Sequence, residues 1–224
     1  MDKQGILKMA LDFLGVKGQA DPKLLGQLAQ AFDQLDNLAP PRPISRRLVR
    51  TSGHETPTLA LQYGALKLEG ESIVAFLEEA PEICIVAATL GQAVDRQLKV
   101  LQQMDVQQAV VFDAVASAYL EGLLDQWNKA FQSSLSGQGY YLSPRFSPGY
   151  GDFPLSTQVG LLAALEGQKR LGIHLNSHYL MVPQKSVTAI IGIHSKPFQS
   201  GYQRCDACQI RHHCQHKGGK CVYS

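Results

Sequence analysis

The sequence predicts an α+β fold: a single domain with a mixed or antiparallel sheet and several helices, including one long central helix. Amphipathic helical segments and short apolar strands follow one another along the chain, without the strict alternation that parallel sheets require. The chain has 224 residues, which is enough for one substantial core. We expect this domain to span residues 1–200 and a cysteine-rich tail to occupy residues 201–224.

The first elements are predicted from helical periodicity and capping residues. Residues 2–15 carry apolar side chains on one helical face, and Gly15 ends the pattern. Asp21 can cap a second helix, because Pro22 is well tolerated at the first helical position. Residues 37–57 are rich in proline and arginine, and we expect them to form an exposed connection.

Strands and helices are then mixed over the rest of the chain. One or two strands are expected within residues 58–70, and further strands at 83–88, 140–142, 179–182 and 187–193. Helices are expected at 73–79, 90–103, 106–133 and 157–171, with Ser72, Thr89 and Ser156 as candidate caps.

Composition excludes several classes of function. The formal charge of +2 offers no basic excess for binding nucleic acid. No apolar run reaches membrane-spanning length, and the N-terminus lacks the apolar core of a signal peptide, so we expect no membrane contact and a cytoplasmic location.

The densest basic patch is either a solvated loop or a docking site for an acidic partner. It consists of Arg42, Arg46, Arg47 and Arg50.

Residues 144–154, Pro-Arg-Phe-Ser-Pro-Gly-Tyr-Gly-Asp-Phe-Pro, form the most informative stretch. The prolines disfavour helix and the glycines permit positive φ, so the backbone should be extended and kinked. Arg145, Phe146 and Tyr150 are expected to project from it. An ordered loop that leads into a helix is a good position for ligand contacts.

This stretch, the helix after it and the strand at 186–195 together resemble the activation domain of cobalamin-dependent methionine synthase. The likeness covers roughly residues 113–197. In that family the Arg-x-x-x-Gly-Tyr stretch binds S-adenosylmethionine. The resemblance therefore implies a binding site made of Arg145, Ser147, Gly149 and Tyr150, with Glu121 at an acidic position of the long helix.

Each of these residues also has a purely structural interpretation. Arg145 could bind the ligand's carboxylate, or it could form a salt bridge with a nearby acid such as Asp152. Glu121, one helical turn from Asp125, could hydrogen-bond a ribose or lie on a solvated face. Tyr150 could be an ordinary half-buried aromatic, and Gly149 could simply form a turn.

The tail contains a cluster of four cysteines, Cys205, Cys208, Cys214 and Cys221. In a reduced compartment such thiols suggest a metal centre, because thiolates repel one another unless a cation gathers them. The spacing fits zinc or a [4Fe–4S] cluster, and free thiols or disulfides remain an alternative. Cys84 lies within an apolar strand and is expected to be a core residue.

The resemblance implies a freestanding activation subunit that binds S-adenosylmethionine for reductive methylation of a partner's cobalamin. The sequence has no cobalamin-binding Asp-x-His-x-x-Gly motif, so the corrin is expected on a separate methionine synthase polypeptide. Two alternatives stay open: a non-catalytic interaction module with a structural metal tail, and a reactivator of another corrinoid methyltransferase.

Overall fold

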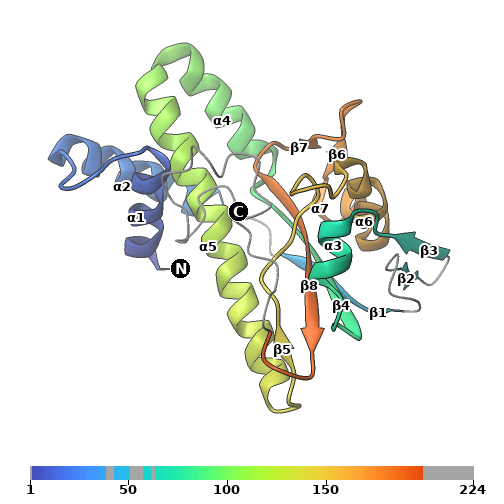
Figure 1. Cartoon of the computed structure of the whole chain (residues 1–224). Coiled ribbons are helices and arrows are strands. Elements are labelled where there is room, and N and C mark those ends of the chain that lie inside the picture. The colour runs from blue at the N-terminus through green and yellow to red at the C-terminus, as the bar shows by residue number, and fades with distance from the viewer. Residues whose placement is uncertain (1, 39–42, 51–57, 62–63, 199–224) are drawn as a thin grey trace.

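The computed structural model describes residues 2–38, 43–50, 58–61 and 64–198, and at its centre is a four-stranded antiparallel sheet (Figure 1). The strand order is β1-β4-β8-β5. The strands are β1 (Ile44–Val49), β4 (Glu82–Thr89), β8 (Ser186–His194) and β5 (Tyr141–Leu142). Every neighbouring pair in this sheet is antiparallel. The predicted α+β class is confirmed, and the sheet is antiparallel rather than mixed.

The two central strands are buried on both faces. Along β4, Cys84, Val86 and Ala88 belong to one hydrophobic cluster. The alternate residues Ile83, Ile85 and Ala87 belong to the other. Successive strand residues point to opposite faces, so a strand covered on both sides must be apolar throughout. This explains why β4 reads as an unbroken apolar run in the sequence.

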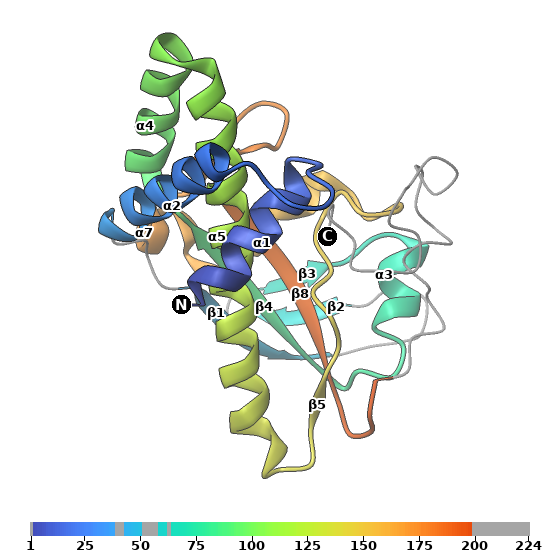
Figure 2. The same cartoon turned by 90° about the vertical axis from the view of Figure 1, so that its left-hand side faces the viewer.

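Four helices cover one face of the sheet, as Figure 2 shows. They are α1 (Lys3–Phe13), α2 (Pro22–Asn37), α4 (Gly91–Met104) and α5 (Val106–Ser136). The α5 helix is 31 residues long and is the predicted long central helix. The predicted caps Asp21 and Thr89 both accept backbone hydrogen bonds, from Lys23 at 2.9 Å and from Gly91 at 3.0 Å.

Smaller elements cover the opposite face. The helical ones are α3 (Glu71–Phe76), the 3₁₀ turn η1 (Leu155–Thr157), α6 (Gln158–Leu165) and α7 (Gly167–Leu171). Two hairpins accompany them, β2 (Thr58–Leu61) with β3 (Gly64–Lys67), and β6 (His174–Leu175) with β7 (Met181–Val182). The sheet therefore lies between a layer of long helices and a layer of short elements.

Several local predictions were wrong. Ser72, a predicted helix cap, lies inside α3, and Gly70 is at the capping position. Residues 44–49 form the edge strand β1 instead of an exposed connection. The predicted helix 157–171 is broken at Glu166, whose φ of 54° is left-handed, and Ser156 lies in η1 and provides no side-chain cap.

Each arginine of the basic patch that the structure describes has a specific partner, although Arg47 is exposed. Arg46 donates to the carbonyl of Ala164 at 3.0 Å. Arg47 pairs with Glu82, and Arg50 donates to the carbonyl of Leu77 at 2.6 Å. Arg42 lies outside the described residues. These arginines tie the edge of the sheet to its neighbours, so we do not assign them to a docking surface.

No helix within the described ranges is long and apolar enough to cross a membrane.

Candidate functional site

The loop that follows β5 is held on the sheet by Phe146. Its N–H donates to the carbonyl of Ile190 at 2.9 Å, and the N–H of Ile190 donates back at 2.8 Å. The ring of Phe146 is buried and packs on Phe76, with ring centroids 4.8 Å apart. The expectation that Phe146 projects from the loop was therefore wrong, because its ring is part of the core. Its burial fixes where the neighbouring Arg145 leaves the sheet.

Residues 147–153 form a tight turn closed by its own backbone. The N–H of Gly149 donates to the carbonyl of Phe153 at 2.8 Å, and the N–H of Phe153 donates to Tyr150 at 2.9 Å. Ser147 accepts from the N–H of Tyr150 at 3.2 Å. Gly149 has a φ of +97°, a value that disfavours any residue with a Cβ. Glycine is thus required by the turn, whether or not a ligand lies against it.

Arg145 lies between two carboxylates of α5. Its Nη2 is 2.7 Å from Oε2 of Glu121, and its Nη1 is 3.0 Å from Oδ1 of Asp125. The side chains of Arg145 and Glu121 are about one-fifth exposed, at 18% and 21%, and that of Asp125 is 43% exposed. The two acids, one helical turn apart, share one guanidinium, which relieves the repulsion expected from their spacing. Glu121 and Arg145, both expected at the binding site, are thus in direct contact.

The alternative partner, Asp152, has a different role. Its carboxylate accepts hydrogen bonds from the N–H groups of Glu71 at 2.5 Å and Ser72 at 2.9 Å, at the start of α3. Desolvation raises the pKa of this carboxyl, but the hydrogen bonds from Ser72 and Glu71 outweigh that effect and lower the pKa below its usual value. Asp152 therefore caps α3. Arg145 does form a salt bridge, as its structural interpretation suggested, but with Glu121 and Asp125 instead of Asp152.

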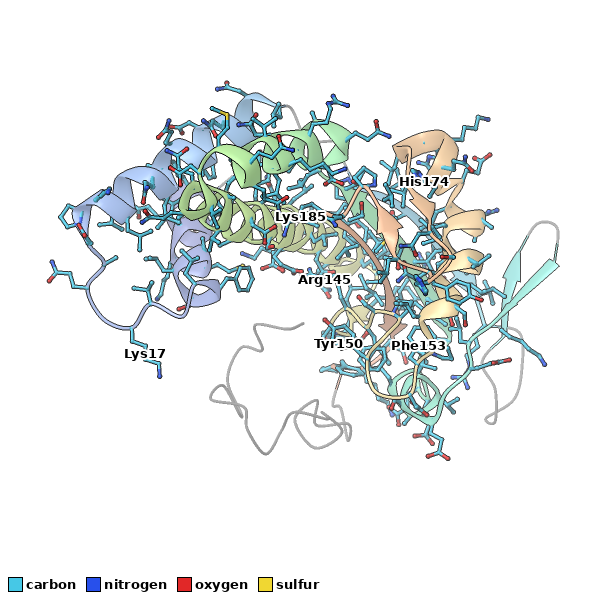
Figure 3. The ribbon with its side chains drawn as sticks, turned by 90° about the horizontal axis from the view of Figure 1, so that it is seen from above. Lys17, Arg145, Tyr150, Phe153, His174 and Lys185 are labelled. Atoms are coloured by element: carbon cyan, nitrogen blue, oxygen red, sulfur yellow. The ribbon has the colours of Figure 1, made fainter. Side chains whose placement is uncertain are left out.

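Tyr150 lies at the rim of the loop. Its side chain is half-buried, and its ring meets that of Phe146 edge-on, with centroids 6.0 Å apart. Figure 3 shows Tyr150 near Phe153, with Arg145 between them and the long helix. The loop thus presents a cation and an aromatic ring side by side, the combination that a charged nucleoside can use.

A second cation, Lys185, contacts polar side chains of α5. Lys185 contacts Oδ1 of Asp113 at 2.9 Å and Oγ of Ser117 at 2.7 Å. With Glu121 and Asp125, these residues occupy positions at four-residue intervals, so they form one polar stripe on the helix. Sequence reasoning missed Asp113 and Lys185. The four-residue spacing of polar side chains on α5 could have indicated Asp113, but Lys185 lies just before β8 and no local pattern pointed to it.

A pocket of about 420 Å³ lies elsewhere, between the end of α1, α4 and the start of α5. Phe13, Leu98 and Val110 are among the side chains that line it, and its described lining includes no residue of the 144–154 loop. It touches the polar stripe only at Asp113 and Ser117. The pocket is therefore separate from the residues expected to bind S-adenosylmethionine.

No group of three or more histidine, cysteine or acidic side chains suited to a metal ion occurs among the described residues. The four tail cysteines, Cys205, Cys208, Cys214 and Cys221, lie outside them, so the predicted metal centre stays a prediction. Cys84 is buried as expected, and desolvation raises the pKa of its thiol to about 12. A thiol with such a pKa is inert, in agreement with a core role.

Comparison with known proteins identifies the fold. No protein-family model matches the chain, and no curated protein sequence matches it. Among solved structures, the chain is similar to the crystal structure of the MetH reactivation domain bound to AdoHcy, with a TM-score of 0.64. The match covers 99% of this chain and 84% of the other, at 16% sequence identity. The described part of the chain therefore has the fold of that reactivation domain.

Proposed function

We propose that the chain is a freestanding reactivation subunit that binds S-adenosylmethionine and presents its methyl group to cobalamin carried by a methionine synthase polypeptide. The observation that carries the proposal is the position of Arg145. It lies on a loop that is anchored to the sheet, and its side chain contacts Glu121 and Asp125. The fold adds support, because a structure with the same architecture is a MetH reactivation domain bound to AdoHcy.

The charges of the site suit the amino-acid end of this ligand. A guanidinium can bind a carboxylate through two parallel hydrogen bonds, and Arg145 is the cation of the loop. The ligand's ammonium group needs an anion nearby, which Glu121 or Asp125 supplies. Tyr150 offers an aromatic edge at the loop rim for the adenosine, and the Gly149 turn keeps side-chain bulk away from it.

Binding and orientation are the tasks of this chain's residues. When bound, S-adenosylmethionine supplies an electrophilic methyl group on its sulfonium. Arg145 and its acids would fix one end of the molecule, and the loop would fix the other, so that the methyl points outward. Correct placement alone supplies a large part of the acceleration of a group transfer, and no acid or base need take part.

One observation favours the interaction-module alternative. Arg145 already pairs with two acids, and the Gly149 N–H already donates within the turn. The same contacts would hold the loop in a protein that binds no nucleoside. A reactivator of another corrinoid methyltransferase would use the same site and differ only in its partner.

Calorimetric titration with S-adenosylmethionine tests the proposal. We expect the wild type to bind and Arg145→Ala to lose about 2 kcal/mol or more, the scale of a truncated charge-assisted pair. Arg47→Ala is the matched control, because Arg47 also pairs with an acid, Glu82, but lies on β1. Equal affinity in the wild type and Arg145→Ala would refute the site, and a wild type that binds nothing would support the interaction module.

A further inference from the structure

We propose that Asp125 determines ligand specificity: it exchanges Arg145 for the ligand's ammonium group and makes the site prefer S-adenosylmethionine over its demethylated product. This inference rests on the proposed function and assigns a distinct role to one residue of the same site. The asymmetry of the two ion pairs at Arg145 and the charges of the three side chains support it.

The two ion pairs of Arg145 are unequal. The contact to Glu121 is 2.7 Å long and joins side chains that are 18% and 21% exposed. The contact to Asp125 is 3.0 Å long, and Asp125 is 43% exposed. An ion pair that is longer and more solvated contributes less, because water screens it. An incoming carboxylate therefore displaces Asp125 from Nη1 more easily than it displaces Glu121 from Nη2.

The displaced carboxylate then lies beside the amino-acid end of the ligand. The ammonium and carboxylate of an α-amino acid are attached to the same carbon. A group that binds Nη1 of Arg145 thus brings its ammonium close to the carboxylate that previously held Nη1. The exchange leaves no charge without a partner, since Arg145 gains the ligand's carboxylate and Asp125 gains the ammonium.

The charge of the cluster distinguishes substrate from product. Arg145 contributes one positive charge, and Glu121 and Asp125 contribute two negative charges, so these three side chains together carry one negative charge. S-adenosylmethionine carries one net positive charge because of its sulfonium, whereas S-adenosylhomocysteine is neutral overall. The resting cluster is therefore complementary to the methyl donor, and product release is favoured after the methyl group leaves.

Asp125→Asn should separate the contribution of the ammonium contact from that of the attraction between the Asp125 charge and the sulfonium. Loss of the ammonium contact weakens both ligands by about tenfold, the scale of a hydrogen bond between charged groups. The sulfonium lies a few bonds from the ammonium, so loss of the negative charge weakens S-adenosylmethionine by roughly a further threefold at the dielectric of a half-exposed site. The affinity ratio of donor to product should fall by that second factor.

The experiment titrates the full-length chain with S-adenosylmethionine, S-adenosylhomocysteine and 5′-methylthioadenosine. The third probe lacks the amino-acid end, so its affinity should be unchanged in Asp125→Asn. Asp125→Glu, which keeps the charge, should retain the preference for the donor. Asp113→Asn is the matched control. Asp113 lies on the same helix as Asp125, but it pairs with a different cation, Lys185. It is twelve positions away, about 18 Å along the axis, which exceeds the Debye length of about 8 Å.

Each outcome decides the inference. A fall in the donor-to-product ratio in Asp125→Asn, with no change in Asp113→Asn, supports it. An unchanged ratio in Asp125→Asn overturns the inference, while donor binding that still depends on Arg145 leaves the proposed function standing. Loss of 5′-methylthioadenosine binding in Asp125→Asn means that the site has collapsed, and this too overturns the inference. If the wild type binds none of the three probes, the proposed function itself fails.

Discussion

Replacing Asp152 should destabilise the protein through a helix that is far away in the sequence. Asp152 accepts hydrogen bonds from the first two N–H groups of α3, those of Glu71 and Ser72. The residue at the capping position, Gly70, has no side chain to do this. Loss of a helix cap costs about 1 kcal/mol, within a range of roughly 0.5–2. We expect that loss for Asp152→Ala and a smaller one for Asp152→Asn, which keeps one acceptor oxygen.

The effect should depend on pH in a defined direction. The pKa of the Asp152 carboxyl is lowered in the folded protein, because the hydrogen bonds of α3 outweigh desolvation. Its contribution to stability is therefore complete above the unfolded pKa of about 3.9 and disappears as the pH falls through the lower, folded value. The free energy of unfolding of the wild type should exceed that of Asp152→Asn most at neutral pH. The two free energies should converge below about pH 4.

Urea unfolding at pH 7 and at about pH 3 measures this, provided the slope with denaturant is the same in each variant. Glu69→Ala is a suitable control, since Glu69 is an exposed acid beside the same helix. A free energy of unfolding for Asp152→Ala that matches the wild type at pH 7 would refute the capping role. A difference between the wild type and Asp152→Asn that grows toward acid pH would refute the assigned direction of the pKa shift.

Two further predictions concern a buried histidine and the tail. Desolvation lowers the pKa of His194, despite an opposing contribution from Glu79, so the neutral form is favoured in the folded state. The stability of the folded protein should therefore be unaffected by His194 above the unfolded pKa of about 6.5 and should fall as the pH drops below it. In His194→Gln, the free energy of unfolding should change less with pH between pH 7 and 5. An equally steep curve in the variant would contradict this. Metal analysis after anaerobic purification should find about four irons or about one zinc per chain, and Cys205→Ser with Cys208→Ser should abolish it. Unchanged metal content would show that these cysteines are not ligands.

The long or uniform elements of the fold could be predicted because their patterns are local. The α5 helix and the β4 strand each have one continuous signature, and both lie close to the predicted ranges. The β1 strand was missed because it is an edge strand. Its exposed positions are Ser45, Arg47 and Val49, its inward face also carries Arg46, and it follows a proline-rich stretch, so its composition resembles that of a loop. On its inward face, Leu48 belongs to a core cluster and Ile44 packs against it.

The site could be predicted in part for a similar reason. The loop sequence identified Arg145, Gly149 and Tyr150, but nearness in the sequence suggested Asp152 as the acid for Arg145. The observed partners come from α5, 20 and 24 residues earlier, and Asp152 instead caps a helix about 80 residues away. Long-range pairing of this kind depends on how the layers stack, which no local pattern encodes.

The proposed function requires this chain to enable methyl transfer to a partner's cobalamin. The most direct measurement mixes it with a cobalamin-dependent methionine synthase that lacks its own reactivation domain and has been oxidised to the Co(II) state. S-adenosylmethionine and a reductant are added, and the cobalamin absorption spectrum is followed. The account predicts that methylcobalamin forms only when the wild-type subunit is present, and much more slowly with Arg145→Ala. Methylcobalamin that forms equally well without the subunit, or never forms with it, would contradict the account.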